Sequence, residues 1–183
     1  MKHRVRYRRF LSIILLFASL SLTGRAAYPQ SIDVRTRVVY IVSFIRYIKW
    51  PPASVAERVR KVGIYGTDAE LLRELQDAAR QPQQDFQLIV RQVNDLADAS
   101  DLHLIYLPAS KTNRDIRKVN EILGNAPILI FAEREGTARD GAAISLFELE
   151  AGNRMTFEYN ESELTRRQLK ADPLLLSKGL PAK

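Results

Sequence analysis

Short apolar segments alternate with amphipathic helical patterns through the middle of the chain, and this order restricts the fold more than any other feature. The segment Leu102–Leu107, LHLIYL, is apolar on both sides, as the central strands of parallel sheets are. Three further apolar runs predict strands at Lys61–Gly66, Phe86–Val93 and Pro127–Phe131. Helices are predicted at Asp68–Gln81 and Asn113–Leu123, with a short turn or helix at Asn94–Ala99. This order implies right-handed crossovers and an α/β fold, with a mainly parallel sheet and helices on both faces.

The alternation stops after Phe131. Two strands are predicted at Ala142–Leu149 and Arg154–Tyr159, and the four residues between them are a hairpin-length link. A C-terminal antiparallel hairpin should therefore border the parallel sheet. A last helix is expected to begin near Glu161, and a short turn to follow Pro173.

The first helix is predicted over Ser31–Lys49, with Ser31 as a capping residue near Asp33. One apolar stripe consists of Val34, Val38, Ile41, Ile45 and Ile48, and an aromatic stripe beside it consists of Tyr40, Phe44 and Tyr47. Trp50-Pro51-Pro52 ends the helix, because proline cannot continue the backbone bonding. Apolar groups cover more than the usual single face. The helix is therefore either deeply buried or half buried with a face left for a partner, and we predict a homodimer, with Trp50 in the core or the dimer interface.

The N-terminal segment has the three parts of a secretory signal. The opening nine residues carry five cations and no acid, and an apolar run of 13 residues follows from Phe10 to Leu22. That run is shorter than the ~20 residues of a membrane-spanning helix. Gly24 and Ala26 are small residues suited to a cut after Ala26. We predict a signal peptide over 1–26, a periplasmic location, and a single α/β domain over 27–183; the alternative is an uncleaved N-terminal anchor.

Removal of that segment changes the charge balance. The whole chain has 28 Lys and Arg against 21 Asp and Glu, and six of the cations precede the cut. The mature chain keeps 22 cations and 21 acids, so nucleic-acid binding, which depends on clustered cations facing phosphates, loses its main support. Because the chain contains no cysteine, neither a disulfide framework nor a thiol switch is available.

The sequence offers few groups for catalysis or for a cofactor. After the cut the chain keeps one histidine, His103, which we interpret as a sheet residue inside LHLIYL. One histidine without a thiol cannot supply the ligand set of a zinc site. No nucleophile elbow, phosphate loop or dinucleotide fingerprint occurs, and Gly63 and Gly66 are better explained by a tight turn. We therefore expect no cofactor, no metal and no enzymatic activity.

Acidic residues outside the helices also have simple interpretations. Asp68 follows the first strand and precedes a helical run, which is typical of an N-cap rather than a phospho-acceptor. Glu133, Glu135 and Asp140 alternate with two arginines, which is typical of a solvated loop.

Three stretches resemble the YfiR-like family of periplasmic regulators. The stretches are Phe44–Pro51, with an aromatic-basic-aromatic run ending in Trp-Pro, then Val62–Gly66, and then Gly141–Asn160, with a Gly-Asn-Arg hairpin and a Phe-Glu-x-Asn strand. Leu169-Lys170 and the leucines after Pro173 resemble the leucine-rich tail of the family. The chain departs from its best-known relatives in lacking cysteines, and in having Gly141-Ala142 where two glycines are usual.

The resemblance implies a periplasmic inhibitor that performs no chemistry. Such proteins bind the outer sensory domain of an inner-membrane diguanylate cyclase and hold it inactive, which lowers cyclic di-GMP and limits biofilm formation. The candidate partner-binding residues are Tyr40, Phe44, Tyr47, Glu158, Asn160 and Lys170. As alternatives, Asn160 caps the last helix and Glu158, at the sheet margin, pairs with a neighbouring cation.

Two other functions stay open. The α/β architecture is compatible with a sensor of a small-molecule ligand, because the strand ends of such sheets often form pockets. An enzyme with an unrecognised site would show a cleft holding an acid of perturbed pKa.

Overall fold

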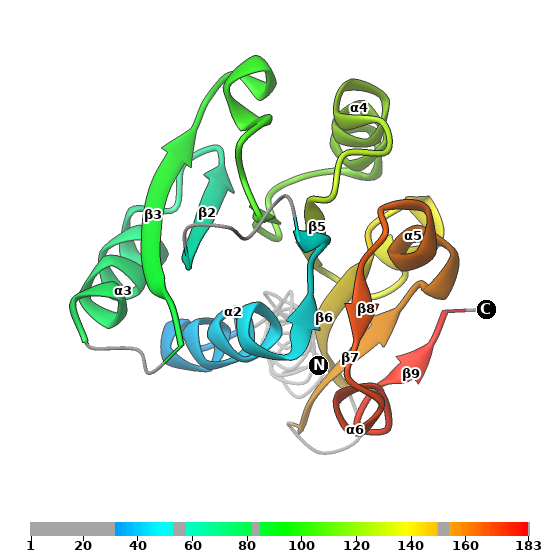
Figure 1. Ribbon diagram of the computed structural model, residues 1–183. Coiled ribbons are helices and arrows are strands. Elements are labelled where there is room, and N and C mark those ends of the chain that lie inside the picture. The colour runs from blue at the N-terminus through cyan, green and yellow to red at the C-terminus, as the bar shows by residue number, and fades with distance from the viewer. Residues whose placement is uncertain (1–31, 53–57, 82–84, 150–153, 183) are drawn as a thin grey trace, which may run out of the picture. The chain divides into compact units, whose positions relative to one another are not determined.

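A central sheet of seven strands runs through the part of the chain that the structure describes (Figure 1). In this computed structural model the described residues are 32–52, 58–81, 85–149 and 154–182. The strands are β2 (Val59–Tyr65), β3 (Gln87–Val93), β4 (Leu104–Leu107), β5 (Leu129–Glu133), β6 (Ile144–Leu149), β7 (Arg154–Tyr159) and β9 (Leu180–Pro181). The predicted signal peptide, its cut after Ala26 and the hairpin link at 150–153 lie outside the described residues.

The sheet order is β3-β2-β4-β5-β6-β7-β9, and β6 with β7 is its antiparallel pair. The neighbours from β3 to β6 are parallel, as is the pair of β7 with β9. This confirms the predicted α/β class, with a mainly parallel sheet and a C-terminal hairpin. Residues Ile32–Lys183 form one compact unit.

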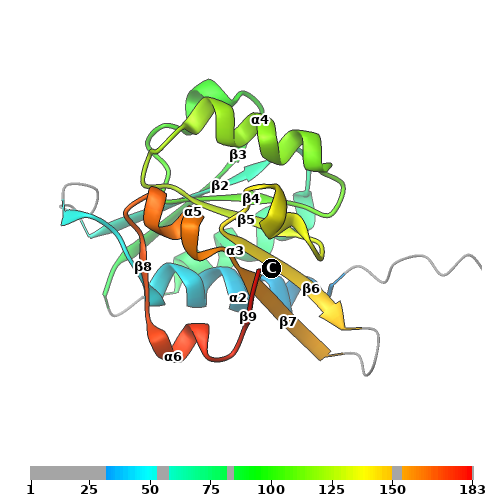
Figure 2. The same cartoon turned by 90° about the vertical axis from the view of Figure 1, so that its right-hand side faces the viewer.

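Helices cover both faces of the sheet, as predicted (Figure 2). The helices and 3-10 turns are α2 (Val34–Tyr47), α3 (Ala69–Arg80), η3 (Leu96–Ala99), α4 (Asn113–Leu123), η4 (Thr137–Asp140), α5 (Glu161–Arg166) and α6 (Pro173–Leu176). Buried residues of α2 and α3 share one core with one face of the sheet, and those of α4 and η3 share a second core with the other. Strand β4 supplies both cores alternately, which explains why its four residues, LIYL, are apolar on both sides: Tyr106 lies in the first core and Ile105 in the second.

Helix α2 begins and ends inside the predicted range. The carboxylate of Asp33 caps it by accepting a hydrogen bond from the backbone N–H of Thr36, and Ser31, the capping residue predicted from the sequence, lies outside the described residues. After Tyr47 the chain turns into strand β1 (Ile48–Lys49), which pairs antiparallel with β8 (Lys170–Ala171). The prediction that the helix reaches Lys49 was wrong, because pairing with a distant segment extends its last two residues.

Two adjacent arginines fasten α5 to the end of α4. Arg167 is fully buried and donates from Nη1 to the carbonyl of Ala126 at 3.1 Å and from Nη2 to Oδ1 of Asn120 at 2.6 Å. Arg166 donates to the same Asn120 oxygen and to the carbonyl of Gly124. Burial, followed by the charge of Arg166, lowers the pKa of Arg167 to about 10. Cations thereby occupy the C-terminal end of α4, where helix carbonyls lack partners.

Replacing Arg167 should therefore destabilise the fold strongly. We expect Arg167→Met to lower the free energy of unfolding by about 3 kcal/mol, because Asn120 and the carboxylate of Glu163, which lies 3.5 Å from Arg167, lose a buried partner. The control is Arg117→Met, which removes the exposed ion pair with Asp140 and should cost under ~1 kcal/mol. Urea unfolding followed by circular dichroism measures both, and equal losses would contradict a structural clamp at Arg167.

Candidate partner-binding surface

The strand order places a topological switch point between β2 and β4. The chain passes from β2 outward to β3 and then returns to add β4 on the other side of β2. In open α/β sheets, ligands bind in the crevice at the carboxyl ends of the strands beside such a switch. The ligand-sensor alternative therefore predicts a binding site where β2, β4 and β5 end.

The side chain of Arg37, from α2, fills this position. It is buried, and its Nη1 lies 2.6 Å from Oδ2 of Asp68, just after β2, and 3.6 Å from Oε2 of Glu133, at the end of β5. The hydroxyl of Tyr106, on β4, donates to the same Glu133 oxygen at 2.7 Å. The switch-point crevice is thus closed by a cation that the chain itself provides.

The roles of both acids follow from this geometry. Asp68 caps α3 through the N–H of Leu71, as predicted, and also pairs with Arg37. The interpretation of Glu133 as part of a solvated loop was wrong, since only 5% of it is exposed. Its position as the last residue of a central strand, beneath α2, buries it.

The electrostatics of this cluster favour a fixed ion pair. Burial alone would lower the pKa of Arg37, but the nearby Glu133, Tyr106 and Asp68 raise it above its ordinary value. Burial, reinforced by the carboxylate of Glu133, raises the pKa of Tyr106 well above its usual range. At neutral pH a permanent cation and a neutral phenol therefore hold the carboxylates, an arrangement suited to joining α2 to the sheet.

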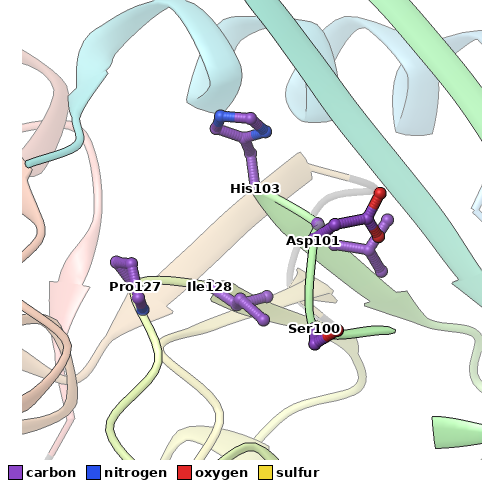
Figure 3. A pocket seen from close by; sticks show the side chains of 6 residues that line it. Ser100, Asp101, His103, Pro127 and Ile128 are labelled. Carbon is purple, nitrogen blue, oxygen red and sulfur yellow. The ribbon is translucent and has the colours of Figure 1, made fainter. Parts of the chain in front are cut away.

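A small pocket lies at the opposite ends of the strands, before β4 and β5 (Figure 3). Its volume is ≈ 150 Å³, below the roughly 300 Å³ at which pockets for small molecules begin. Its one acid, Asp101, pairs with Lys61 and Arg91, and the hydrogen bond from Lys61 is the main cause of its lowered pKa. The small-molecule ligand stays a prediction that neither this pocket nor the filled crevice favours.

The imidazole of His103 borders the same pocket and points away from Ser100 and Ile128 (Figure 3). Its Nδ1 accepts the backbone N–H of Lys61 at 3.1 Å, and the indole of Trp50 packs edge-on against its ring at 5.8 Å. His103 is thus buried directly before β4, one residue outside the strand in which the sequence placed it, and its backbone bonds to Lys61 and Leu129 of the neighbouring strands. Trp50 is a core residue.

No cluster of three or more metal-ligating side chains occurs within the described ranges. Over the same ranges, no helix combines the length and the apolar character needed to cross a bilayer.

Of the predicted partner contacts, the two residues in the middle of α2 point inward. Phe44 is fully buried, and its ring packs edge-on against Phe131 at 5.2 Å and Phe157 at 5.0 Å. It is a core residue and presents no side-chain surface to a partner, which corrects its assignment. Tyr40 is half buried, contacts Phe157, and donates its hydroxyl to the carbonyl of Met155.

Glu158 and Asn160 support the η4 turn. Glu158 is buried and accepts a hydrogen bond from the backbone N–H of Gly136, while β9 pairs alongside it, so it does not lie at a free sheet margin. The side chain of Asn160 donates to the carbonyl of Ala138 and caps α5 through the N–H of Glu163. The alternative expected for Asn160, a helix cap, matches this geometry, and the partner of Glu158 is a backbone group rather than a cation.

Tyr47 and Lys170 are the two candidates that the fold exposes and brings together. Tyr47 is 46% exposed at the end of α2, and Lys170 is exposed in β8, which pairs with the strand that follows Tyr47. A groove beside them is lined by Tyr47, Asp172, Leu174, Leu175 and Lys178. Sequence analysis did not select Leu174 or Lys178 as partner contacts. The signal that could have found them was a proline followed by three leucines, of which Leu174 is largely exposed.

A model of the YfiR/HmsC-like family matches residues 35–179, from the first turn of α2 to the end of the groove. The chain belongs to the YfiR/HmsC-like family. This family consists of periplasmic, non-enzymatic proteins that regulate diguanylate cyclases.

Among solved structures, the fold is similar to that of a conserved domain protein from Vibrio cholerae O1 biovar El Tor. The TM-score is 0.57 at 14% identity, and the likeness covers 85% of this chain and 61% of the other, so this chain spans less than two thirds of that protein. At this identity the likeness shows a shared fold alone. No curated protein matches the chain.

The cluster at the crevice gives a test of its structural role. We expect Arg37→Met to lower the free energy of unfolding at pH 7 by about 3 kcal/mol, because Asp68 and Glu133 lose their shared buried cation. Arg35→Met, at an exposed position of the same helix, should change it by no more than ~0.5 kcal/mol. Urea unfolding measures both. If the Arg37 variant is as stable as the control variant, the fold does not depend on the cation in the crevice.

Proposed function

We propose that this protein inhibits an inner-membrane diguanylate cyclase by binding the cyclase's periplasmic sensory domain, and thereby limits cyclic di-GMP and biofilm formation. The observation that carries the proposal is the family match over residues 35–179, which includes nearly all of the described chain. The closed crevice supports a role in binding rather than in chemistry, since Arg37 occupies the place where sheets of this kind hold ligands.

The inhibition requires only a difference in affinity between two states of the cyclase. A binding protein shifts such an equilibrium by as much as it prefers one state over the other. A tenfold reduction in the ratio of active to inactive cyclase corresponds to about 1.4 kcal/mol of preference for the inactive state. A modest interface that distinguishes the two states is therefore sufficient, and no cofactor takes part.

The proposal predicts a rise in cyclic di-GMP when the gene is deleted. The strain must express a membrane-anchored diguanylate cyclase with a periplasmic domain, and an open reading frame for such an enzyme beside this gene is the first choice. Complementation with the full chain should restore the low level, and a chain lacking residues 1–26 should not, because it stays in the cytosol. Mass spectrometry of nucleotide extracts measures the effect, and an unchanged level after deletion would refute the proposal.

We also propose that the protein is a homodimer, because apolar residues cover more of α2 than the single face that a surface helix usually buries. Part of that apolar surface is accounted for within the chain, because Ile41, Phe44 and Ile45 are buried. Val39 is 63% exposed on the same helix and is the apolar position around which two copies would pair. Light scattering should give twice the monomer mass at micromolar concentration, and Val39→Glu should reduce it to the monomer mass. A monomer mass for the unmodified protein would overturn the proposal.

A further inference from the structure

Two lysines face each other across the β1–β8 ribbon. Lys49 and Lys170 are register partners in this antiparallel pair, so their side chains lie on the same face. Both are exposed, and neither belongs to an ion pair within the described ranges. Like charges directly opposite each other weaken a strand pair.

An apolar groove adjoins the ribbon on the side of α6. Its cavity volume is ≈ 210 Å³, and Tyr47, Leu174, Leu175 and Lys178 line it with Asp172. Leu174 is 70% exposed, and α6 contains three leucines with none of its residues buried. Lys178, a third exposed lysine, also has no ion pair within the described ranges.

The exposure of Leu174 is fixed by local bonding, whereas Leu175 and Leu176 are half buried. The backbone N–H of Asp172 donates to the carbonyl of Tyr47 at 3.0 Å, which ties α6 to the end of α2. The carboxylate of Asp172 caps α6 through the N–H of Leu174 at 2.8 Å, with Pro173 in the first turn. The groove is therefore a formed feature of the fold, and its apolar surface is available without rearrangement.

We infer that this lysine–leucine patch, consisting of Tyr47, Lys49, Lys170, Leu174, Leu175 and Lys178, binds an acidic segment of the cyclase's periplasmic domain. The inference rests on the proposed function and names the chemistry of its partner. The segment places an aliphatic or aromatic side chain in the groove, and flanking Asp or Glu residues meet the three lysines.

The charge and the shape of the patch favour a protein segment over a second copy of the chain and over a membrane surface. A second copy of the chain docked through the same patch would bring identical lysines together, which is repulsive. A membrane surface would share the attraction to lysine, but the groove is concave and receives a single side chain, whereas membrane binding uses a continuous apolar face. A protein segment satisfies both the charge and the groove.

Site-specific photo-crosslinking in cells tests the inference. The full chain carries p-benzoylphenylalanine in place of Tyr47 or Leu174, and in control chains in place of Ile122 on α4 or Ile89 on β3, which are also exposed and apolar. Figure 2 shows α4 and α6 on opposite sides of the sheet. We expect the two patch positions to crosslink one peptide of the cyclase, with acids beside an apolar residue, at about tenfold the control yield. Equal yields at the controls, or adducts only to this chain itself, would overturn the inference.

Charge reversal separates binding from folding. Lys49→Glu with Lys170→Glu keeps a like-charged pair in the ribbon, so the stability should hardly change, while the crosslinking yield should fall about tenfold. Lys49→Glu alone creates an opposite-charge pair with Lys170, so it should raise the stability of the fold and still lower the yield. The control changes the same number of charges on α4, with Arg114→Glu and Lys118→Glu, and should leave the yield unchanged. A yield insensitive to the patch variants would refute the inference.

The outcomes distinguish this inference from the proposed function. If the patch captures another periplasmic protein and not the cyclase, the inference is overturned, whereas the proposed function is decided separately by the level of cyclic di-GMP after deletion. If Ile122 captures the cyclase and the patch does not, the function holds and the patch is refuted. Co-sedimentation of the purified protein with phosphatidylglycerol vesicles, lost on reversal of Lys49 and Lys170 and accompanied by no peptide adduct, would assign the patch to membrane lipid and also overturn the inference.

Discussion

The attachment of α2 to the sheet is the interaction on which the other features depend. Phe44 inserts its ring between Phe131 and Phe157, and the guanidinium of Arg37 reaches the carboxylates at the strand ends. The first contact removes apolar surface from water, and the second holds the helix in one position along the sheet. Because α2 is fixed at both places, its last residue, Tyr47, has a defined position. The C-terminal segment uses that position when Asp172 bonds to the carbonyl of Tyr47.

The same attachment explains how a fold associated with ligand binding can belong to a regulatory, non-enzymatic family. The switch point between β2 and β4 would ordinarily leave a crevice for a small molecule. Here a buried arginine, two carboxylates and a phenol occupy it, with Nη1 of Arg37 paired to both carboxylates and the phenol bonded to Glu133. Surface available for recognition therefore lies outside the sheet, on the exposed side of α2 and on the C-terminal turn. Regulation through such a surface needs a difference in affinity rather than a reacting group.

Local patterns predicted the fold better than they predicted the environment of single polar residues. LHLIYL fixed the central strand, and the hairpin strand Arg154–Tyr159 has the bounds that its alternation predicts. Glu133 and Lys49 were misplaced because distant segments decide their surroundings: α2 covers the first, and β8 pairs with the second. In the candidate site, Tyr47 and Lys170 came from the family resemblance, and the same resemblance selected the buried Phe44. An aromatic stripe shows which residues are apolar, but only the packed structure shows which of them face outward.

The lysine pair of the β1–β8 ribbon is not required for the stability of the fold, which makes a role in recognition the simpler explanation for it. A like-charged pair directly across two strands costs a fraction of a kcal/mol, which a domain with about 5–15 kcal/mol of stability tolerates. The buried arginines are different, since Arg37 and Arg167 each have partners inside the chain that need them. Lys49, Lys170 and Lys178 have no such partners among the described residues, so their charge is directed at solvent or at another molecule. An anionic segment bound there would remove the repulsion within the ribbon as it docks, and binding would tighten the junction between α2 and the C-terminal turn. Because Asp172 already orders that turn, little conformational entropy is lost on association.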